Sequence, residues 1–440
     1  MNSTPAAGSN PVMDELRQRI HHELIDELGP VLYDRRLSED ELEKRVQEHL
    51  QRALSREAAP ISANDRARLL RDVADDILGY GPIDQYLKDD EVTEVMVNGP
   101  KQVYVERYGK LEPTNTTFID DSHLRRIIDK MVGQVGRRID EATPMVDARL
   151  PDGSRVNAVV HPLAVGGPFL TVRKFSTDAL TVDDLIRLHT LTPGVAGFLE
   201  ACVLGRLNVV VSGGTGTGKT TTLNMLSSFI PDDERIVTVE DAKELQTRQE
   251  HVLSLEARPP NIEGRGEVAI RDLVRNALRM RPDRIVVGEC RSGEALDMLQ
   301  AMNTGHDGSL TTVHANSPRD VLARIETMTL MAGFDLPIRA IREQMASALH
   351  LVVHLSRMRD GTRRITHITE IQGMEGDTIV TQDLFRFDFG MGIDDDGHQR
   401  GFLKATGLRP GFGDELEDRG IHLPAEMFQP EQFARRVVGG

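Results

Sequence analysis

The chain has 440 residues, of which 28% are charged and 4% aromatic, and its formal net charge at pH 7 is −16. This length accommodates two to three domains, and the composition is that of a folded globular protein. An acidic protein gains no counterion-release attraction to DNA, so the charge balance disfavours nucleic acid as the main partner, although a local basic groove is compatible with it.

The sequence also indicates a cellular compartment. Its two cysteines, Cys202 and Cys290, make neither a disulfide framework nor a zinc-binding spacing, which is typical of a reducing compartment. Residues 1–8 have neither the basic nor the apolar segment of a signal peptide, and no apolar run reaches the ~18 residues of a membrane span. We therefore expect a cytoplasmic protein that meets a membrane only through a partner.

The first part of the chain is predicted to be helical. Apolar residues recur at three- and four-residue steps over residues 12–54, with a break at Gly29–Pro30. A further helix is predicted over about residues 63–78, after a linker at residues 58–60. We assign residues 1–88 to a helical N-terminal extension.

After this extension the apolar period changes from helical to alternating. Residues 91–107 and 145–160 alternate around turns that contain Gly and Pro, which predicts two β-hairpins. A helix over about residues 122–135 and a last strand at residues 171–175 complete the pattern. We therefore expect a separate α+β domain over residues 89–180.

The most specific motif follows an apolar run, Val209–Val211, which predicts a buried strand. Gly213-x-x-x-x-Gly218-Lys219-Thr220 is the pattern of a phosphate-binding loop, whose glycines let several N–H groups face one phosphate. Lys219 is expected to reach the β- and γ-phosphates of ATP, and the Thr220 hydroxyl to complete a Mg²⁺ shell at the start of a helix. The predicted nucleotide-binding residues of this loop are Gly213, Gly214, Thr215, Gly216, Thr217, Gly218, Lys219, Thr220 and Thr221.

Short apolar strands alternate with helical segments beyond this loop. The strands are predicted at about residues 235–240, 284–288 and 309–314. Such alternation predicts a doubly wound, parallel α/β sheet over residues 181–389, and ligands of such sheets bind at the carboxyl ends of the strands.

Two of these strands lead into acidic residues. Glu240 is the candidate general base, because a carboxylate at a strand end beside bound phosphates can orient and deprotonate water. Its alternative is an ordinary helix-capping or turn acid. Glu289 ends the next strand and is expected to organise Mg²⁺ together with Thr220.

Three further residues are candidates for catalysis. Arg291 follows Glu289 and is expected to pair with a carboxylate or a phosphate. His306 and His314 bracket a predicted strand but have no Cys or carboxylate at zinc-binding spacing. They are expected to sense the γ-phosphate, and the alternative is that both are ordinary turn histidines.

Two other segments carry charge patterns. Arg271, Arg275 and Arg279 lie four apart on a predicted amphipathic helix. Such a stripe is typical of a solvated face, and in an oligomer the alternative is a face that meets a neighbour's acids or nucleotide. Residues 390–440 are predicted to be a C-terminal extension, and the spacing of Asp394–Asp396 within it does not fit a calcium loop.

Four motifs in one order give the chain a family resemblance. The phosphate loop, residues 239–246, residues 278–289 and residues 304–317 resemble the Walker A, Asp box, Walker B and His box of the type II/type IV secretion-system ATPases. Residues 135–141 and 145–157 are similar to the CpaF-like branch, which powers assembly of tight-adherence (Flp) pili. The resemblance covers about residues 75–385.

This resemblance implies a RecA-like P-loop ATPase domain with a smaller α+β N-terminal domain, working as a homohexamer. Family members hydrolyse ATP to move pilin subunits or secreted substrates through a polytopic inner-membrane platform protein. The resemblance also assigns Arg149, Arg155 and Arg173 to the phosphates. If residues 152–153 form a two-residue turn, Arg149 and Arg155 face opposite sides, whereas a three-residue loop at 152–154 puts them on one face.

Other functions remain open. The chain is alternatively a RecA-like ATPase that translocates nucleic acid, a nucleotide-gated scaffold without catalysis, or a small-molecule kinase. The acidic balance weighs against the first, and candidate residues in all four boxes weigh against the second. A kinase would leave the Asp and His boxes unexplained.

Overall fold

The computed structural model describes residues 78–175, 179–260, 265–393 and 399–430, helix α2 (Glu39–Arg56), and isolated positions elsewhere in the first 77 residues. It divides into two compact units, Met1–Ser176 and Thr177–Gly440, which we describe separately. Several predicted features lie outside the described residues, namely the break at Gly29–Pro30, the linker at 58–60, most of the helix at 63–78, and Asp394–Asp396.

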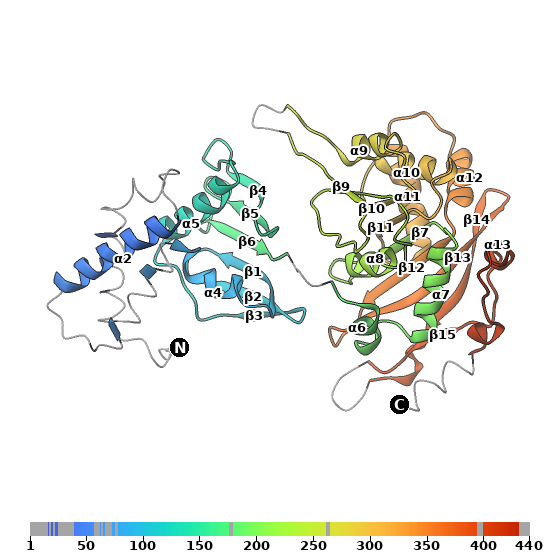
Figure 1. Cartoon of the computed structure of the whole chain (residues 1–440), viewed down its shortest axis with the longest axis horizontal. Coiled ribbons are helices and arrows are strands. Elements are labelled where there is room, and N and C mark those ends of the chain that lie inside the picture. Colours follow the sequence, from blue (N-terminus) through green and yellow to red (C-terminus); the bar gives the residue numbers. More distant parts are fainter. Residues whose placement is uncertain are drawn as a thin grey trace. The chain divides into compact units, whose positions relative to one another are not determined.

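Unit 1 is built on a six-stranded sheet of order β3-β2-β1-β6-β5-β4, with neighbouring strands antiparallel (Figure 1). Alternation in β1 buries Val95 and Val97 in one core with Ile127 and Met131 of helix α5. The two predicted hairpins are present as β1–β2 and β4–β5. The elements are η1 (Gly81–Ile83), α4 (Asp84–Leu87), β1 (Val92–Asn98), β2 (Val103–Arg107), β3 (Lys110–Pro113), α5 (Asp121–Gln134), β4 (Met145–Arg149), β5 (Arg155–Val159) and β6 (Phe169–Arg173).

A smaller apolar cluster precedes this sheet in unit 1. Leu16, Ile20 and Leu24, which recur at four-residue steps, are buried together with Val46 and Leu50 of α2. The helical period of the N-terminal segment therefore reflects one buried face.

Unit 2 is built on a nine-stranded sheet of order β15-β14-β13-β12-β7-β11-β10-β8-β9 (Figure 1). The strands from β12 to β9 in this order are parallel, and β13, β14 and β15 extend the sheet with antiparallel pairing. The predicted α/β architecture with a parallel sheet is confirmed for the strands from β12 to β9, with β11 inserted between the phosphate-loop strand β7 and β10. The strands are β7 (Val209–Gly213), β8 (Ile236–Glu240), β9 (Val252–Glu256), β10 (Arg284–Cys290), β11 (Leu310–His314), β12 (Leu351–Arg357), β13 (Arg363–Glu375), β14 (Thr378–Phe387) and β15 (Leu403–Ala405).

Helices cover both faces of this sheet. Val209 and Val211 face a core shared with α7 and α8, whereas Val210 between them faces a core shared with α9 to α12. A continuous apolar run is therefore required, because both faces of the strand are buried. The helices are α6 (Val182–Arg187), α7 (Pro193–Leu204), α8 (Lys219–Ser227), α9 (Ile270–Ala277), α10 (Glu294–Asn303), α11 (Pro318–Met331), α12 (Ile338–Ala348), η2 (Phe389–Met391), α13 (Gly413–Asp418) and η3 (Ala425–Phe428).

The arginine stripe on α9 has a role that the sequence analysis did not predict. Arg271 Nε lies 2.8 Å from Asp297 Oδ2, and Arg275 Nε lies 2.7 Å from Asp297 Oδ1. Asp297 is buried on α10, so two of the three arginines neutralise a buried charge inside the unit. Arg275 remains largely exposed, as expected for a solvated face, but both arginines also pair with an acid of their own unit, which the stripe alone did not predict.

The C-terminal segment packs against unit 2. Phe412 and Phe428 join Phe198 of α7 in one aromatic cluster, and Arg419 donates to the Gly205 carbonyl at the end of that helix. Residues 403–430 thus contribute to the main core. Across the part of the chain that the structure describes, no helix combines the length and apolarity needed to cross a bilayer.

Arg284 at the start of β10 gives a test of the fold. Its side chain is fully buried and its guanidinium binds both carboxylate oxygens of Glu234. Because Glu234→Ala leaves this charge unpaired, we expect the free energy of unfolding to fall by about 3–5 kcal/mol in urea titrations. Glu343→Ala, which breaks an exposed pair with Arg339, should cost less than about 0.5 kcal/mol. Equal losses in the two variants would contradict the account.

Candidate functional site

The phosphate loop connects the end of β7 to the start of α8, as the motif predicts. Gly213 has a φ of +157°, and a Cβ atom there would lie 2.5 Å from Thr217 Oγ1 and 2.6 Å from the Leu355 carbonyl oxygen. Only glycine therefore lets the loop turn this tightly beside β12. The first N–H groups of α8 face the loop, which makes its N-terminus a site for an anion.

The lysine of the motif lies against its own loop. Lys219 Nζ donates to the Gly214 carbonyl over 2.9 Å, and Thr217 Oγ1 donates to the same oxygen over 3.0 Å. A positive charge is thus held directly over the loop that the sequence assigns to phosphates.

Glu240 is the most unusual ionisable group at this edge. It is 3% exposed at the end of β8, and its Oε1 accepts from the backbone N–H groups of Glu244 (2.8 Å) and Leu245 (3.0 Å). Its Oε2 is buried and has no hydrogen-bond partner among the described residues. Burial raises the pKa of Glu240 to about 7, although the two backbone bonds oppose that shift. One oxygen is therefore fixed, and the other is left to bind a water or a proton.

The space that Glu240 occupies depends on a glycine in the neighbouring strand. A Cβ atom on Gly288 of β10 would lie 2.8 Å from Glu240 Cγ. Any other residue at 288 would push the carboxylate out of its position. Glycine is therefore required directly before Glu289, because Glu240 of the neighbouring strand β8 occupies the space that a side chain at residue 288 would need.

Glu289 and Arg291 form a charged cluster with the Asp box. The Arg291 guanidinium donates to Glu289 Oε2 (2.7 and 3.0 Å) and to Asp241 Oδ2 (2.9 Å). The predicted pairing of Arg291 with a carboxylate is therefore present, and it links the acid that follows Glu240 to the acid at the end of β10. This arrangement orients Glu289 rather than leaving Arg291 extended into solvent.

The residues near Thr220 are suited to a hard cation. The Thr220 hydroxyl lies 3.5 Å from Oε2 of Glu244, a residue that the sequence analysis did not select. Hydroxyl and carboxylate oxygens are the donors that Mg²⁺ prefers, and Mg²⁺ in nucleotide sites takes most remaining ligands from phosphate and water. Within the described ranges no three His, Cys, Asp or Glu side chains gather as a metal cage, and a site of this type does not require one.

The two candidate histidines lie at opposite ends of β11. His314 ends the strand and pairs with Gly213 at the base of the phosphate loop. His306 precedes the strand, where its backbone N–H bonds to Ala301 of α10. The structure therefore brings His314, and not His306, to the phosphate loop, because a parallel strand carries its two ends to opposite edges of the sheet.

Two arginines that the sequence analysis missed flank the phosphate loop. Arg357 and Arg363 are cross-strand neighbours at the tip of the β12–β13 hairpin. Arg357 Nη1 lies 3.9 Å from the Cβ position of Gly216, and Arg363 Cδ lies 3.5 Å from that of Gly218. No motif marks these arginines, because only the pairing of β12 with β7 brings them to the loop.

The three arginines assigned by the resemblance form a row in unit 1. Arg149 is opposite Arg155 in the β4–β5 pair, and Arg155 is opposite Arg173 in the β5–β6 pair, so all three share one sheet face. The hairpin closes through Leu150 N–H and the Ser154 carbonyl, so its three-residue loop begins at Pro151, one residue earlier than expected. The Arg149 guanidinium also lies over the Phe175 ring, 5.9 Å from its centre.

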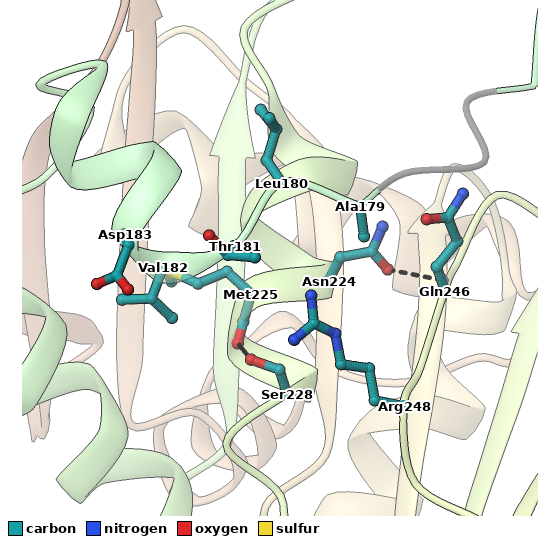
Figure 2. A pocket seen from close by; sticks show the side chains of 10 residues that line it. All are labelled: Ala179, Leu180, Thr181, Val182, Asp183, Asn224, Met225, Ser228, Gln246 and Arg248. Carbon is teal, nitrogen blue, oxygen red and sulfur yellow. Dashed lines mark hydrogen bonds between the residues drawn. The ribbon is translucent and has the colours of Figure 1, made fainter.

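A cavity of about 300 Å³ lies farther along α8, beyond its first turn. Figure 2 shows Asn224 of this helix and Ser228 directly after it on one side and Gln246 and Arg248 on another, with Asn224 Oδ1 accepting from the Gln246 backbone over 2.9 Å. Met225 of α8 and residues 179–183 at the start of unit 2 complete the lining. The cavity thus adjoins the phosphate-loop helix but is distinct from the anion site at its N-terminus.

Comparisons with known proteins show which family the sequence matches. A family described as "Type II/IV secretion system protein" matches residues 76–381. The chain is 39% identical over 331 residues to "Putative conjugal transfer protein Rv3659c" of Mycobacterium tuberculosis, spanning 74% of this chain and 93% of that protein. It is 31% identical over 326 residues to "Type IV secretion system protein VirB11" of Bartonella henselae, spanning 65% and 90%.

Solved structures with similarity include the VirB11 ATPase of the Brucella suis type IV secretion system in complex with sulphate. It is 30% identical, with a TM-score of 0.36, and the match covers 65% of this chain and 94% of that chain.

Burial of Glu240 predicts a pH-dependent stability. Its pKa is raised in the folded state, so the native protein binds more protons than the unfolded chain between about pH 4.5 and 7, and stability should fall as pH rises through this range. Relative to wild type, Glu240→Gln should therefore gain up to about 3 kcal/mol between pH 5 and pH 8 in urea titrations. Glu250→Gln, which removes an exposed carboxylate, is the matched control variant. A pH-independent difference for Glu240→Gln would show that the carboxylate is not titrating as described.

Proposed function

The chain belongs to the type II/IV secretion system protein family, and we propose that it is a Mg²⁺-dependent ATP hydrolase that drives pilus assembly or protein secretion. The observation that carries the proposal is the buried Glu240, with one oxygen held by backbone N–H groups and the other unpartnered among the described residues, at the same sheet edge as the phosphate loop.

The phosphate loop binds the triphosphate in this proposal. Backbone N–H groups from Gly213 to Thr221 surround the β- and γ-phosphates, and the dipole of α8 adds to their attraction. Lys219 exchanges its bond to the Gly214 carbonyl for phosphate oxygens, which are stronger acceptors for an ammonium group. Arg357 and Arg363, at the tip of the neighbouring hairpin, add positive charge on the other side of the loop.

Glu240 activates the attacking water. A base is most effective when its pKa lies near the working pH, and burial brings Glu240 to about 7. With Oε1 fixed, Oε2 orients a water toward the γ-phosphorus and takes its proton as the bond to the β-phosphate oxygen breaks. Inorganic phosphate and ADP are the products.

Magnesium fits the oxygens at the start of α8. Thr220 would hold the ion directly, while Glu289, and Glu244 beside Thr220, would accept from its bound waters. When bound, Mg²⁺ would supply positive charge that offsets the negative charge of the phosphates. Arg291 keeps the Glu289 carboxylate in position for this role.

The remaining candidates couple hydrolysis to motion in this proposal. His314, at the end of β11, lies beside the loop and senses loss of the γ-phosphate. The row of Arg149, Arg155 and Arg173 is an array of positive charges suited to a polyphosphate, as the resemblance implies. His306 lies at the other edge of the sheet, so the proposal gives it no role at the nucleotide although it belongs to the same His box.

The wider assignment follows the relatives. Two of the relatives of this chain are described as a conjugal transfer protein and a type IV secretion system protein. We propose the CpaF-like branch, and with it a homohexamer that moves pilin or a secreted substrate through a polytopic inner-membrane platform, on the basis of the motifs at residues 135–141 and 145–157.

Two substitutions separate binding from chemistry. Lys219→Ala should abolish turnover because phosphate binding loses its main cation, whereas Glu240→Gln should abolish turnover while it still binds ATP. Phosphate release measured with Mg²⁺ and ATP, together with equilibrium binding of labelled ATP, checks both. Normal hydrolysis by Glu240→Gln would remove Glu240 as the base. Turnover that appears only with added DNA would favour a nucleic-acid motor, and absence of turnover in the wild type would favour a scaffold.

A further inference from the structure

Strand β10 contains an extra residue close to its end, where Glu289 lies. The pairing of β10 with β11 advances by three residues in β10, from Val287 to Cys290, and by two in β11, from Thr311 to Val313. Strand β11 pairs with β7 on its other side without any shift over its whole length, so the extra residue belongs to β10. Such a β-bulge redirects the side chains that follow it.

The bulge changes which side chains face the core between the sheet and helices α9 to α12. Ile285 and Val287 belong to this core, and strict alternation along the strand would place residue 289 there next. Instead Cys290 joins the core, while the Glu289 side chain stays partly exposed and pairs with Arg291. Burial of a charged carboxylate among apolar side chains is strongly unfavourable, so the bulge is what allows an acid at this position.

A side chain of β11 holds this bulge. Thr312 is buried on the strand opposite the extra residue, and its hydroxyl donates to the Gly288 carbonyl oxygen over 2.7 Å. The bond lies between the last regular pair, at Val287, and the point where pairing resumes, at Cys290. It therefore fixes the peptide group that joins Gly288 to Glu289, from which the acid projects.

The same glycine packs against the other acid of the site. The position of a Cβ atom on Gly288 lies 2.8 Å from Cγ and 3.3 Å from Oε1 of Glu240. Regular pairing of β10 with β8 ends one residue before each of these two. The Thr312 hydroxyl is therefore placed to position both acids, Glu289 through the peptide group that precedes it and Glu240 through the glycine that it contacts.

We propose that Thr312 is a positioning residue, whose hydroxyl holds the β10 bulge and thereby fixes Glu289 relative to Glu240. This inference rests on the proposed ATPase function, in which the two acids act on one bound nucleotide. Small misplacements of reacting groups cost large factors in rate. The diphosphate of ADP is bound by the phosphate loop in that proposal, so loss of the hydroxyl should lower kcat and leave ADP affinity nearly unchanged.

Removal of the hydroxyl tests this role. Thr312→Val keeps the shape of the side chain and removes the donor, so kcat for ATP should fall about tenfold while the Kd for ADP changes by less than about twofold. Thr312→Ser restores the donor and should return kcat to within about twofold of wild type. Thr312→Ala, for which the same loss of kcat is expected, keeps the test valid if Thr312→Val does not fold.

Thr311→Val is the matched control, because Thr311 is the neighbouring buried threonine of β11 and its hydroxyl lies 3.4 Å from Cys290 Sγ. Its kcat should stay within about twofold of wild type. Folded Thr312→Val or Thr312→Ala with wild-type kcat, or a serine variant as slow as the valine variant, would overturn the proposal. So would an equal loss of kcat in Thr311→Val, since that outcome indicates only general packing of β11.

A second measurement separates this inference from the proposed function. Hydrogen exchange without nucleotide, followed by mass spectrometry, should be faster in peptides covering residues 287–292 of Thr312→Val than in the same peptides of Thr311→Val, because the bulge has lost its bond to β11. Equal exchange in the two variants would overturn the inference even if the wild type hydrolyses ATP. Faster exchange in Thr312→Val, together with a wild type without turnover, would instead support the contact at the bulge and reject the ATPase proposal.

Discussion

The burial of one carboxylate constrains the rest of the site. Glu240 loses contact with water, keeps one oxygen on two backbone N–H groups, and occupies space that exists only because residue 288 is glycine. Such burial costs free energy and raises the pKa of the carboxyl group toward neutrality. The charged Glu289–Arg291–Asp241 cluster lies next to it. This edge of the sheet therefore holds a buried carboxyl group, Glu240, and a second carboxylate, Glu289, whose position is fixed by an arginine.

Sheet order brings these groups to one edge. Strand β11 lies between β7 and β10, so the phosphate loop, His314, Glu289 and Glu240 follow the carboxyl ends of four adjacent parallel strands. On the other side of β7, strand β12 contributes His354 below the loop and Arg357 beside it. The phosphate-loop strand is therefore paired with a neighbouring strand on each side.

Local patterns predicted much of this arrangement. The phosphate loop and the acids at 240 and 289 were predictable because each motif lies within a few residues of its strand. Arg357 and His354 were not predictable, because they reach the site only through the pairing of β12 with β7. His354 and its partner Ser212, for example, are 142 residues apart in the sequence. The ion pairs of the arginine stripe were not predictable for the same reason, because their acidic partner Asp297 lies on another helix. The different positions of His306 and His314 were not predictable either, because the two residues are close in sequence but lie at opposite ends of β11.

The central claim is that the free oxygen of Glu240 holds the attacking water. A crystal structure of the full chain with Mg²⁺, ADP and aluminium fluoride, which mimics the transferring phosphoryl group, tests this most directly. The account predicts a water bonded to Glu240 Oε2 and in line with the aluminium, with Oε1 still on the N–H groups of Glu244 and Leu245. A water held instead by Glu289 or His314, with Glu240 Oε2 still covered by protein, would contradict it.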